Sequence, residues 1–122
     1  MWYSAKMQTK NIEKKIEKIK RELQTIGEMR PGSLSKQYNV CGKPGCRCKD
    51  PTVPQKHGPY FQLSYAHKGK STTQFIRPGF VKRIEKQIAN YKYFKQLTQE
   101  WINLALEHSK LELEAAKHEV ST

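Results

Sequence analysis

A chain of 122 residues with 36% hydrophobic residues and a net charge of +12 fits one small domain, residues 1–122, with little material for a core. No apolar run reaches the roughly 20 residues that span a bilayer, and the N-terminus lacks the pattern of a secretory signal. We therefore expect a cytoplasmic protein that does not enter a membrane and that needs a metal ion or a partner subunit for stability.

The positive charge is concentrated in the middle of the chain. Residues 30–95 carry fourteen Lys and Arg against Asp50 and Glu85, whereas the net charges of the two flanking segments cancel one another. A localised basic surface is typical of a protein that binds the phosphate backbone of nucleic acid. The alternatives are a solvated surface that keeps the protein in solution, and an acidic membrane or protein partner.

The first predicted element is a helix over residues 3–27. Its apolar residues follow one another at spacings of four and three, as in a heptad, and Gly27 with Pro31 ends it. One narrow stripe does not stabilise a helix alone, so this helix must pack on another. The stripe consists of Ile12, Ile16, Ile19, Leu23 and Ile26.

Residues 31–78 contain short β segments. Ser33–Val40, Tyr60–Tyr65 and Ser71–Ile76 predict strands, and Lys68-Gly69-Lys70 predicts a turn between the last two. We expect a β-hairpin or a three-stranded meander.

A second, longer helix is predicted over residues 79–117. Its apolar seam changes phase between Tyr91 and Phe94, which rotates the apolar face toward a different neighbour. We expect its first half to pack antiparallel to the N-terminal helix and its second half to extend beyond it. The leucines of that second half then require a homodimer or a protein partner, unless the end frays into solvent: Leu104, Leu106, Leu111 and Leu113.

The predicted fold class is therefore α+β and mostly helical. Two long antiparallel, coiled-coil-like helices flank a small β-hairpin or meander that carries a zinc-binding loop.

All three cysteines, Cys41, Cys46 and Cys48, lie within one Gly- and Pro-rich turn. Zinc prefers four nitrogen or sulfur ligands in a tetrahedron, and in a reducing compartment such a cluster is more often a metal site than a set of disulfides. We predict a structural Zn²⁺ ion with His57 as the fourth ligand, because Gly58-Pro59 fixes the chain just beyond it. His67 and Asp50 are the less favoured candidates for the fourth position.

Two other interpretations of the cysteines remain open, a redox-active cluster without metal and, less favoured, an iron–sulfur cluster. Catalysis is not expected. The middle segment has few carboxylates that could act as a general base, and the chain has no HExxH, deaminase or Ser/His/Asp pattern.

Basic residues surround the predicted metal loop and hairpin and continue into the second helix. Aromatic residues lie between them, and such side chains can stack on bases while the basic ones neutralise phosphates. At alternating strand positions aromatics more often pack in a core, so Phe61 and Tyr65 are predicted to be structural. The predicted nucleic-acid-binding residues are Lys36, Lys43, Arg47, Lys49, Lys56, Lys68, Lys70, Arg77, Lys82, Arg83 and Lys86.

Several short runs occur together: Gly-Ser-Leu at 32–34, Cys-Gly-Lys-Pro-x-Cys-Arg-Cys at 41–48, His-Gly-Pro-Tyr at 57–60, Leu-Ser-Tyr at 63–65, Gly-Lys at 69–70 and Asn-Tyr at 90–91. In these runs the chain resembles a family of small uncharacterised prokaryotic proteins associated with mobile genetic elements. The resemblance covers about residues 32–97. It implies a prokaryotic or viral source, a joint role for the cysteines and histidine, and a function related to DNA, but no particular activity.

Two functions follow as hypotheses. The first is a zinc-stabilised nucleic-acid-binding protein, an accessory or regulatory factor for which DNA is favoured over RNA and both remain open. The second is a helical adaptor for another protein, alone or as a dimer, in which the positive charge is incidental.

Overall fold

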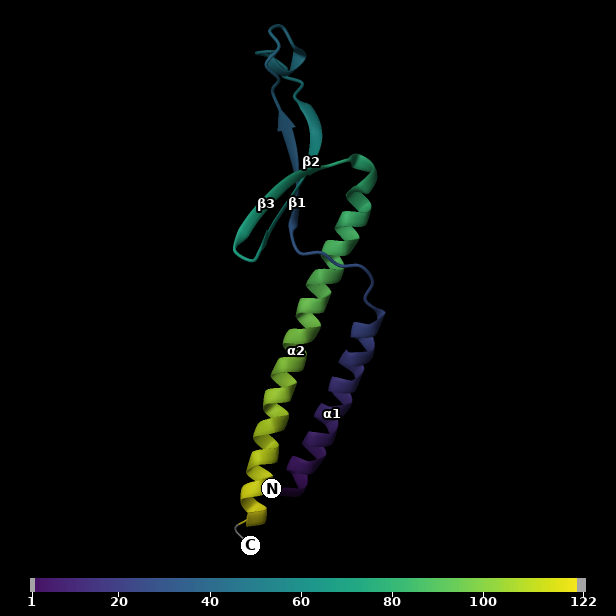
Figure 1. The fold of residues 1–122 in the computed structure, drawn as a ribbon, viewed down its shortest axis with the longest axis vertical. Coiled ribbons are helices and arrows are strands. Elements are labelled where there is room, and N and C mark those ends of the chain that lie inside the picture. Colours follow the sequence, from purple (N-terminus) through teal and green to yellow (C-terminus); the bar gives the residue numbers. More distant parts are fainter. Residues whose placement is uncertain (1, 121–122) are drawn as a thin grey trace. The chain divides into compact units, whose positions relative to one another are not determined.

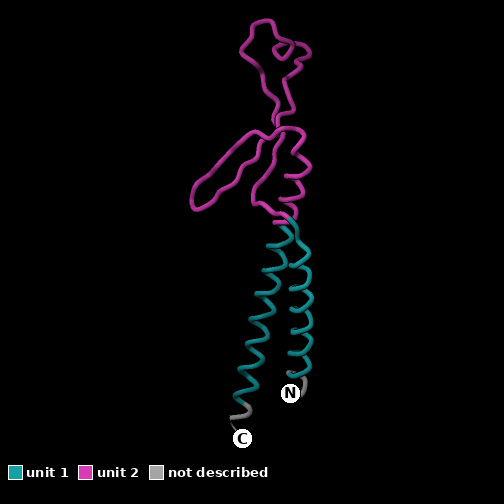
Figure 2. The backbone as a smooth tube through the Cα atoms, turned by 45° about the vertical axis from the view of Figure 1, so that its right-hand side comes forward, with its two compact units in different colours: residues 1–27, 92–122 teal, residues 28–91 magenta. Residues whose placement is uncertain are grey.

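In a computed structural model, residues 2–120 of the chain are described, with side chains over residues 6–117. They form two compact units, residues 1–27 with 92–122 (unit 1) and residues 28–91 (unit 2), which Figure 2 draws in teal and magenta. The elements, in chain order, are α1 (Trp2–Thr25), β1 (Ser33–Asn39), β2 (His57–His67), β3 (Lys70–Ile76) and α2 (Val81–Val120), with short 3-10 turns at Arg47–Lys49 and Pro78–Phe80 (Figure 1).

Unit 2 contains a three-stranded antiparallel sheet in the order β1-β2-β3. Strands β2 and β3 form a hairpin whose two turn residues, Lys68 and Gly69, have φ of 51° and 75°. Positive φ at both positions matches the right-handed twist of the strands. The sequence-based prediction of a meander is confirmed, although β2 begins three residues earlier and ends two residues later than expected.

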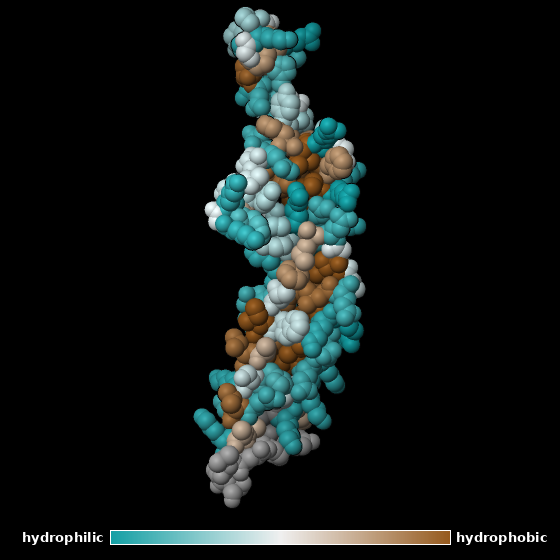
Figure 3. Space-filling model, viewed as in Figure 1, coloured by the Kyte–Doolittle hydropathy of each residue, from teal (hydrophilic) through white to brown (hydrophobic). Residues whose placement is uncertain are grey.

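One face of the sheet is covered by the first turns of α2. Leu63, in the middle of the central strand, has no exposed surface and packs with Ile84 and Ile88 of α2. Leu34, Tyr65 and Ile76 surround this cluster. Figure 3 shows hydrophobic side chains gathered where the sheet meets the helix.

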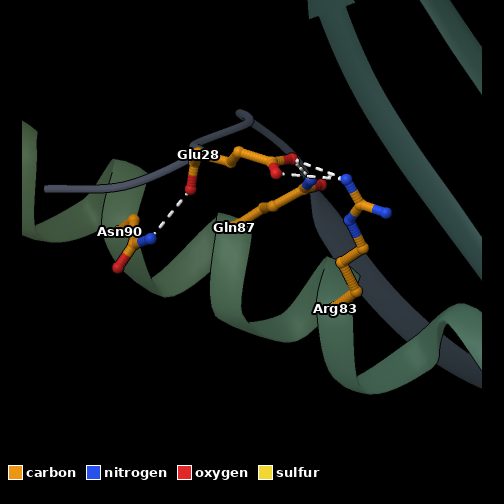
Figure 4. Close-up of polar contacts among 4 residues, drawn as sticks. All are labelled: Glu28, Arg83, Gln87 and Asn90. Atoms are coloured by element: carbon orange, nitrogen blue, oxygen red, sulfur yellow. Dashed lines mark hydrogen bonds and ion pairs between the residues drawn. The ribbon is translucent and has the colours of Figure 1, made fainter.

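A polar cluster binds the loop after α1 to α2 within unit 2 (Figure 4). Arg83 donates two hydrogen bonds to the carboxylate of Glu28, at 3.0 and 3.1 Å, and Gln87 donates a third at 2.9 Å. Asn90 donates to the carbonyl oxygen of Glu28 at 2.8 Å. The hydrogen bonds from Arg83 and Gln87 hold the pKa of the Glu28 carboxyl below its usual value.

In unit 1, α1 faces the part of α2 that begins at Lys92. Tyr93 donates a hydrogen bond to Glu22 at 2.7 Å, and His108 lies 3.0 Å from Glu13. Lys20 lies over the ring of Trp101, 5.4 Å from its centroid. Among residues 6–27 and 92–117 of this unit, the buried apolar side chains are Ile12, Ile19 and Leu97.

The expectation that the first half of the second helix packs on the N-terminal helix is therefore wrong for its first turns, because Ile84 and Ile88 pack with Leu63 of the sheet. A half-buried sheet must cover its apolar face, and the first turns of α2 supply that cover. The phase change in the apolar seam separates the residues that face the sheet from those that face α1.

The second half of α2 also carries apolar side chains that α1 does not cover. Ile102, Leu106 and Leu113 are exposed by 52%, 67% and 64%, whereas Leu104 and Leu111 are partly buried. Figure 3 shows hydrophobic patches along the helices of unit 1, bordered by hydrophilic side chains. Within residues 2–120, no helix has both the length and the apolar character required to cross a bilayer.

Candidate metal centre

The loop between β1 and β2 is ordered by its own short-range hydrogen bonds. Arg47–Lys49 form a single 3-10 turn, and the carbonyl oxygen of Arg47 also accepts from the amide of Gln55 at 2.9 Å. The carboxylate of Asp50 accepts from the amide and hydroxyl of Thr52, at 2.9 and 3.0 Å, and from the amide of Val53. This Asx-type turn reverses the chain and brings its end back toward the cysteines.

These turns bring the four predicted ligands together. The ligand atoms of Cys41, Cys46, Cys48 and His57 all lie within 4.8 Å of one another. The sulfurs of Cys41 and Cys48 are 3.5 Å apart, and Nε2 of His57 is 3.2 Å from the sulfur of Cys46. Tetrahedral zinc separates its sulfur and nitrogen ligands by about 3.6–3.8 Å. The cluster is thus close enough to hold a metal ion, and the chemistry of its donors fits one.

The surroundings of the sulfurs favour metal binding. The backbone amide of Cys48, together with the side chains of Cys41, Cys48 and His57, lowers the pKa of Cys46 to about 6. Burial raises the pKa of Cys48, the least exposed of the three, whose sulfur accepts a hydrogen bond from the amide of Cys41 at 3.3 Å. Thiolate is the form in which cysteine binds metals, so a cation would stabilise the buried sulfur in that form.

Strand pairing positions His57. The residue opens β2 opposite Asn39, beside a bulge in β1 between Gln37 and Asn39. Gly58, which follows, has φ of 136°, and a Cβ atom there would lie only 2.7 Å from the carbonyl oxygen of Gln37. Glycine thus permits the close approach of the strands that brings the imidazole to the sulfurs.

The other two candidates for the fourth ligand lie elsewhere. Asp50 is engaged in the turn that it caps. His67 is the last residue of β2 and His57 the first, so the two histidines lie at opposite ends of an eleven-residue strand, where His67 pairs in register with Lys70. In the part of the chain with described side chains, neither belongs to a group that could hold a metal ion.

All eleven predicted nucleic-acid-binding residues belong to unit 2 and are exposed. Arg83 differs from the rest because it is paired with Glu28. This pairing could not be predicted from the sequence, since charges far apart in a sequence carry no signal of their contact. The other ten make no ion pair within residues 6–117.

The model of a domain of unknown function (DUF6788) matches residues 9–86. The chain belongs to this family. The matched segment contains the four clustered ligands, all three strands and the start of α2. Comparison with curated proteins and with solved structures finds no match.

Proposed function

We propose that the protein binds nucleic acid, with DNA as the natural ligand, through a basic unit 2 whose β1–β2 loop is held by one structural zinc ion. The observation that carries the proposal is the surplus of unpaired positive charge in that unit. Unit 2 has twelve Lys and Arg against Glu28, Asp50 and Glu85. Two of these three carboxylates are engaged, one with Arg83 and one in the turn after Asp50.

The unpaired cations support a phosphate partner. Ten exposed basic side chains without an ion pair repel one another, and a polyanion relieves this repulsion while releasing its own counterions. Lys43, Arg47 and Lys49 belong to the metal loop itself. The resemblance to small prokaryotic proteins associated with mobile genetic elements would agree with DNA as the ligand.

Zinc is the metal that best fits the donors. Three thiolates and one imidazole fill a tetrahedral coordination sphere and leave no open position for a substrate, which suits a structural site and not a catalytic one. The ion would fix a loop that contains no apolar core of its own apart from Cys48. We accordingly propose no enzymatic activity.

Elemental analysis of the protein purified without added metal tests the zinc site. We expect about one zinc per chain, lost in Cys46→Ser and in His57→Ala. His67→Ala is the matched control, because it removes a histidine from the other end of the same strand. Absence of zinc in the wild type, or its retention in His57→Ala, would refute the four-residue site.

Binding of labelled duplex and single-stranded oligonucleotides at several salt concentrations tests the nucleic-acid proposal. The affinity should fall steeply with salt, with a log–log slope of about −0.7 to −0.9 for each phosphate neutralised. A wild-type protein that binds none of these probes at low salt contradicts the proposal.

A second candidate function is a helical adaptor. We propose that α1 and the part of α2 that begins at Lys92 form an antiparallel, coiled-coil-like pair, as the contacts of Glu22 with Tyr93 and of Glu13 with His108 suggest. The observation that favours an adaptor is the exposure of Ile102, Leu106 and Leu113 on this pair. Analytical ultracentrifugation of the wild type and of Leu106→Lys/Leu113→Lys tests it. A dimer that dissociates in the variant supports a self-association surface, whereas a monomeric wild type excludes one.

A further inference from the structure

The sheet of unit 2 has a second face, opposite the one that α2 covers. Side chains alternate between the faces of a strand, so the neighbours of Leu63 on β2 point away from the helix. Contacts between side chains identify this open face: Ser64 with Thr73 at 3.3 Å, Gln37 with Ser35 at 3.3 Å, and the ring of Tyr60 with that of Phe75.

Two aromatic rings lie exposed on the open face. Tyr60 is 42% exposed and Phe75 is 67% exposed, with their centroids 6.4 Å apart and their planes at 70°. The aromatic residues on the covered face are less exposed: Phe61 and Tyr65 of the same strand β2 are partly buried. Phe75, the last residue but one of β3, is left in water and forgoes the usual gain from burial, so a ligand is the simplest reason for its position.

The rest of the open face is polar but carries no negative charge. The sequences of β1, β2 and β3 contain no Asp or Glu at all. Around the two rings lie hydroxyl and amide groups, which can donate and accept hydrogen bonds: Ser35, Gln37, Gln62, Ser64 and Thr73. A protein partner would require a larger apolar area than two rings, whereas flat, polar-edged groups suit this surface well.

Positive charges lie at both ends of this face. Arg77 follows Ile76, whose register partner is Phe61, so Arg77 falls beside Tyr60 at the end of the sheet nearest the metal loop. Lys56 immediately precedes β2 at that end, and Lys68 occupies the turn at the other. None of the three makes an ion pair within residues 6–117.

We propose that the open face binds single-stranded DNA, with bases stacked on Tyr60 and Phe75 and phosphates neutralised by Arg77, Lys56 and Lys68. The inference rests on the proposed nucleic-acid binding and specifies its substrate. Duplex bases already stack on one another and cannot reach a flat sheet, whereas unpaired bases can lie on exposed rings whatever their sequence. A basic surface without aromatic rings could bind a duplex equally well. The exposed rings are therefore the feature that favours single-stranded DNA over a duplex.

Fluorescence anisotropy with a labelled oligothymidine tests the proposal. A length of about 12 nucleotides lies within the usual range of site sizes for proteins that bind single strands. The variant Tyr60→Leu/Phe75→Leu removes both rings but keeps apolar bulk and every charge. We expect its affinity to fall about tenfold or more, with an unchanged salt slope. Phe80→Leu is the matched control, because Phe80 is 52% exposed in the same unit but lies outside the sheet, and it should bind as the wild type does.

The possible results distinguish failure of the stacking surface from failure of nucleic-acid binding as a whole. Unchanged affinity in the double variant, or tighter binding of the wild type to a duplex of the same length, overturns the stacking surface and leaves nucleic-acid binding standing. No binding of the wild type to any probe overturns both. Tighter binding to the matching RNA oligonucleotide overturns DNA as the ligand.

A second variant keeps the proposal testable if the double variant does not fold. Phe75→Trp places a fluorescent ring on the open face, and stacking on a base should quench it on addition of the oligonucleotide. The wild type, whose tryptophans Trp2 and Trp101 belong to the helices α1 and α2, is the control for background quenching. Quenching in the variant no larger than in the wild type contradicts the stacking.

Discussion

Gly58 joins the candidate metal centre to the sheet. Its φ of 136° and the 2.7 Å approach to the carbonyl oxygen of Gln37 leave no room for a side chain. We predict that Gly58→Ala costs about 1–3 kcal/mol of strain or shifts β2 away from β1, and that it weakens metal binding because His57 is the preceding residue. Competition with a zinc chelator measures the loss. Gly45→Ala controls for a positive φ without a close contact, since its added Cβ meets nothing within 4 Å.

Glu28 gives unit 2 a dependence on pH. Its pKa is lowered by the hydrogen bonds from Arg83 and Gln87, so the folded protein favours the carboxylate more than the unfolded chain does. The stabilisation is present at a pH above the usual carboxyl pKa and is lost as the pH falls through the lowered value. We predict that Glu28→Gln lowers the thermal midpoint at neutral pH, by a small amount since the pair is exposed.

Thermal unfolding of the wild type and of Glu28→Gln across a pH series measures this effect. The difference between the two midpoints should shrink in acid, once the carboxyl of the wild type is protonated. A difference that stays constant down to the most acidic pH would show that the carboxylate charge plays no part.

At the scale of elements, the cluster around Leu63 joins the sheet to α2. Leu63 is fully buried against Ile84 and Ile88, so Leu63→Ala removes apolar contacts and leaves a cavity. We predict a loss of about 2–5 kcal/mol in the free energy of unfolding. Chemical denaturation measures it, with Leu106→Ala as the control, because that leucine is 67% exposed and its truncation should cost less than about 0.5 kcal/mol.

Local patterns predicted the elements well. The heptad spacing of Ile12 and Ile19 and the turn at Lys68-Gly69 depend on neighbouring residues, so both could be recognised in the sequence. The element that covers each apolar face could not be recognised in the sequence, because an apolar stripe shows that the face is covered but not which element covers it. Ile84 and Ile88 carry the same pattern whether a helix or a sheet lies against them, and here it is the sheet.

The candidate metal centre was predictable for a similar reason. Its cysteines are close in the sequence, and zinc chemistry limits the possible fourth ligands. The choice of His57 over His67 followed from Gly58-Pro59 in the sequence, and the structure agrees with it, because the two histidines lie at opposite ends of β2 and His57 lies with the cysteines. The open aromatic face could be predicted only in part. That aromatic residues lie among the basic ones is visible in the sequence, but the exposure of Tyr60 and Phe75 depends on which face α2 covers.

At the scale of the whole molecule, positive charge is divided unequally between the units. Unit 2 carries a net +9 and unit 1 a net +3. We predict that a triple variant of the metal loop, Lys43→Gln/Arg47→Gln/Lys49→Gln, makes the salt slope of DNA binding shallower, by up to about 0.9 for each phosphate contact that is lost. A triple glutamine variant of exposed lysines in unit 1 should leave the slope unchanged. That control changes Lys10, Lys14 and Lys18. Equal effects of the two variants on the slope would indicate non-specific attraction.

The four clustered ligands all fall within residues 41–57, and this short distance along the chain has a consequence for assembly. During synthesis the complete ligand set emerges from the ribosome before any residue of α2 emerges, so metal capture need not wait for the core to form. A ligand that also binds the unfolded chain stabilises the folded state by less than its affinity implies. Zinc should therefore act early, as a guide to the β1–β2 turn, more than as a late contribution to the stability of the finished protein.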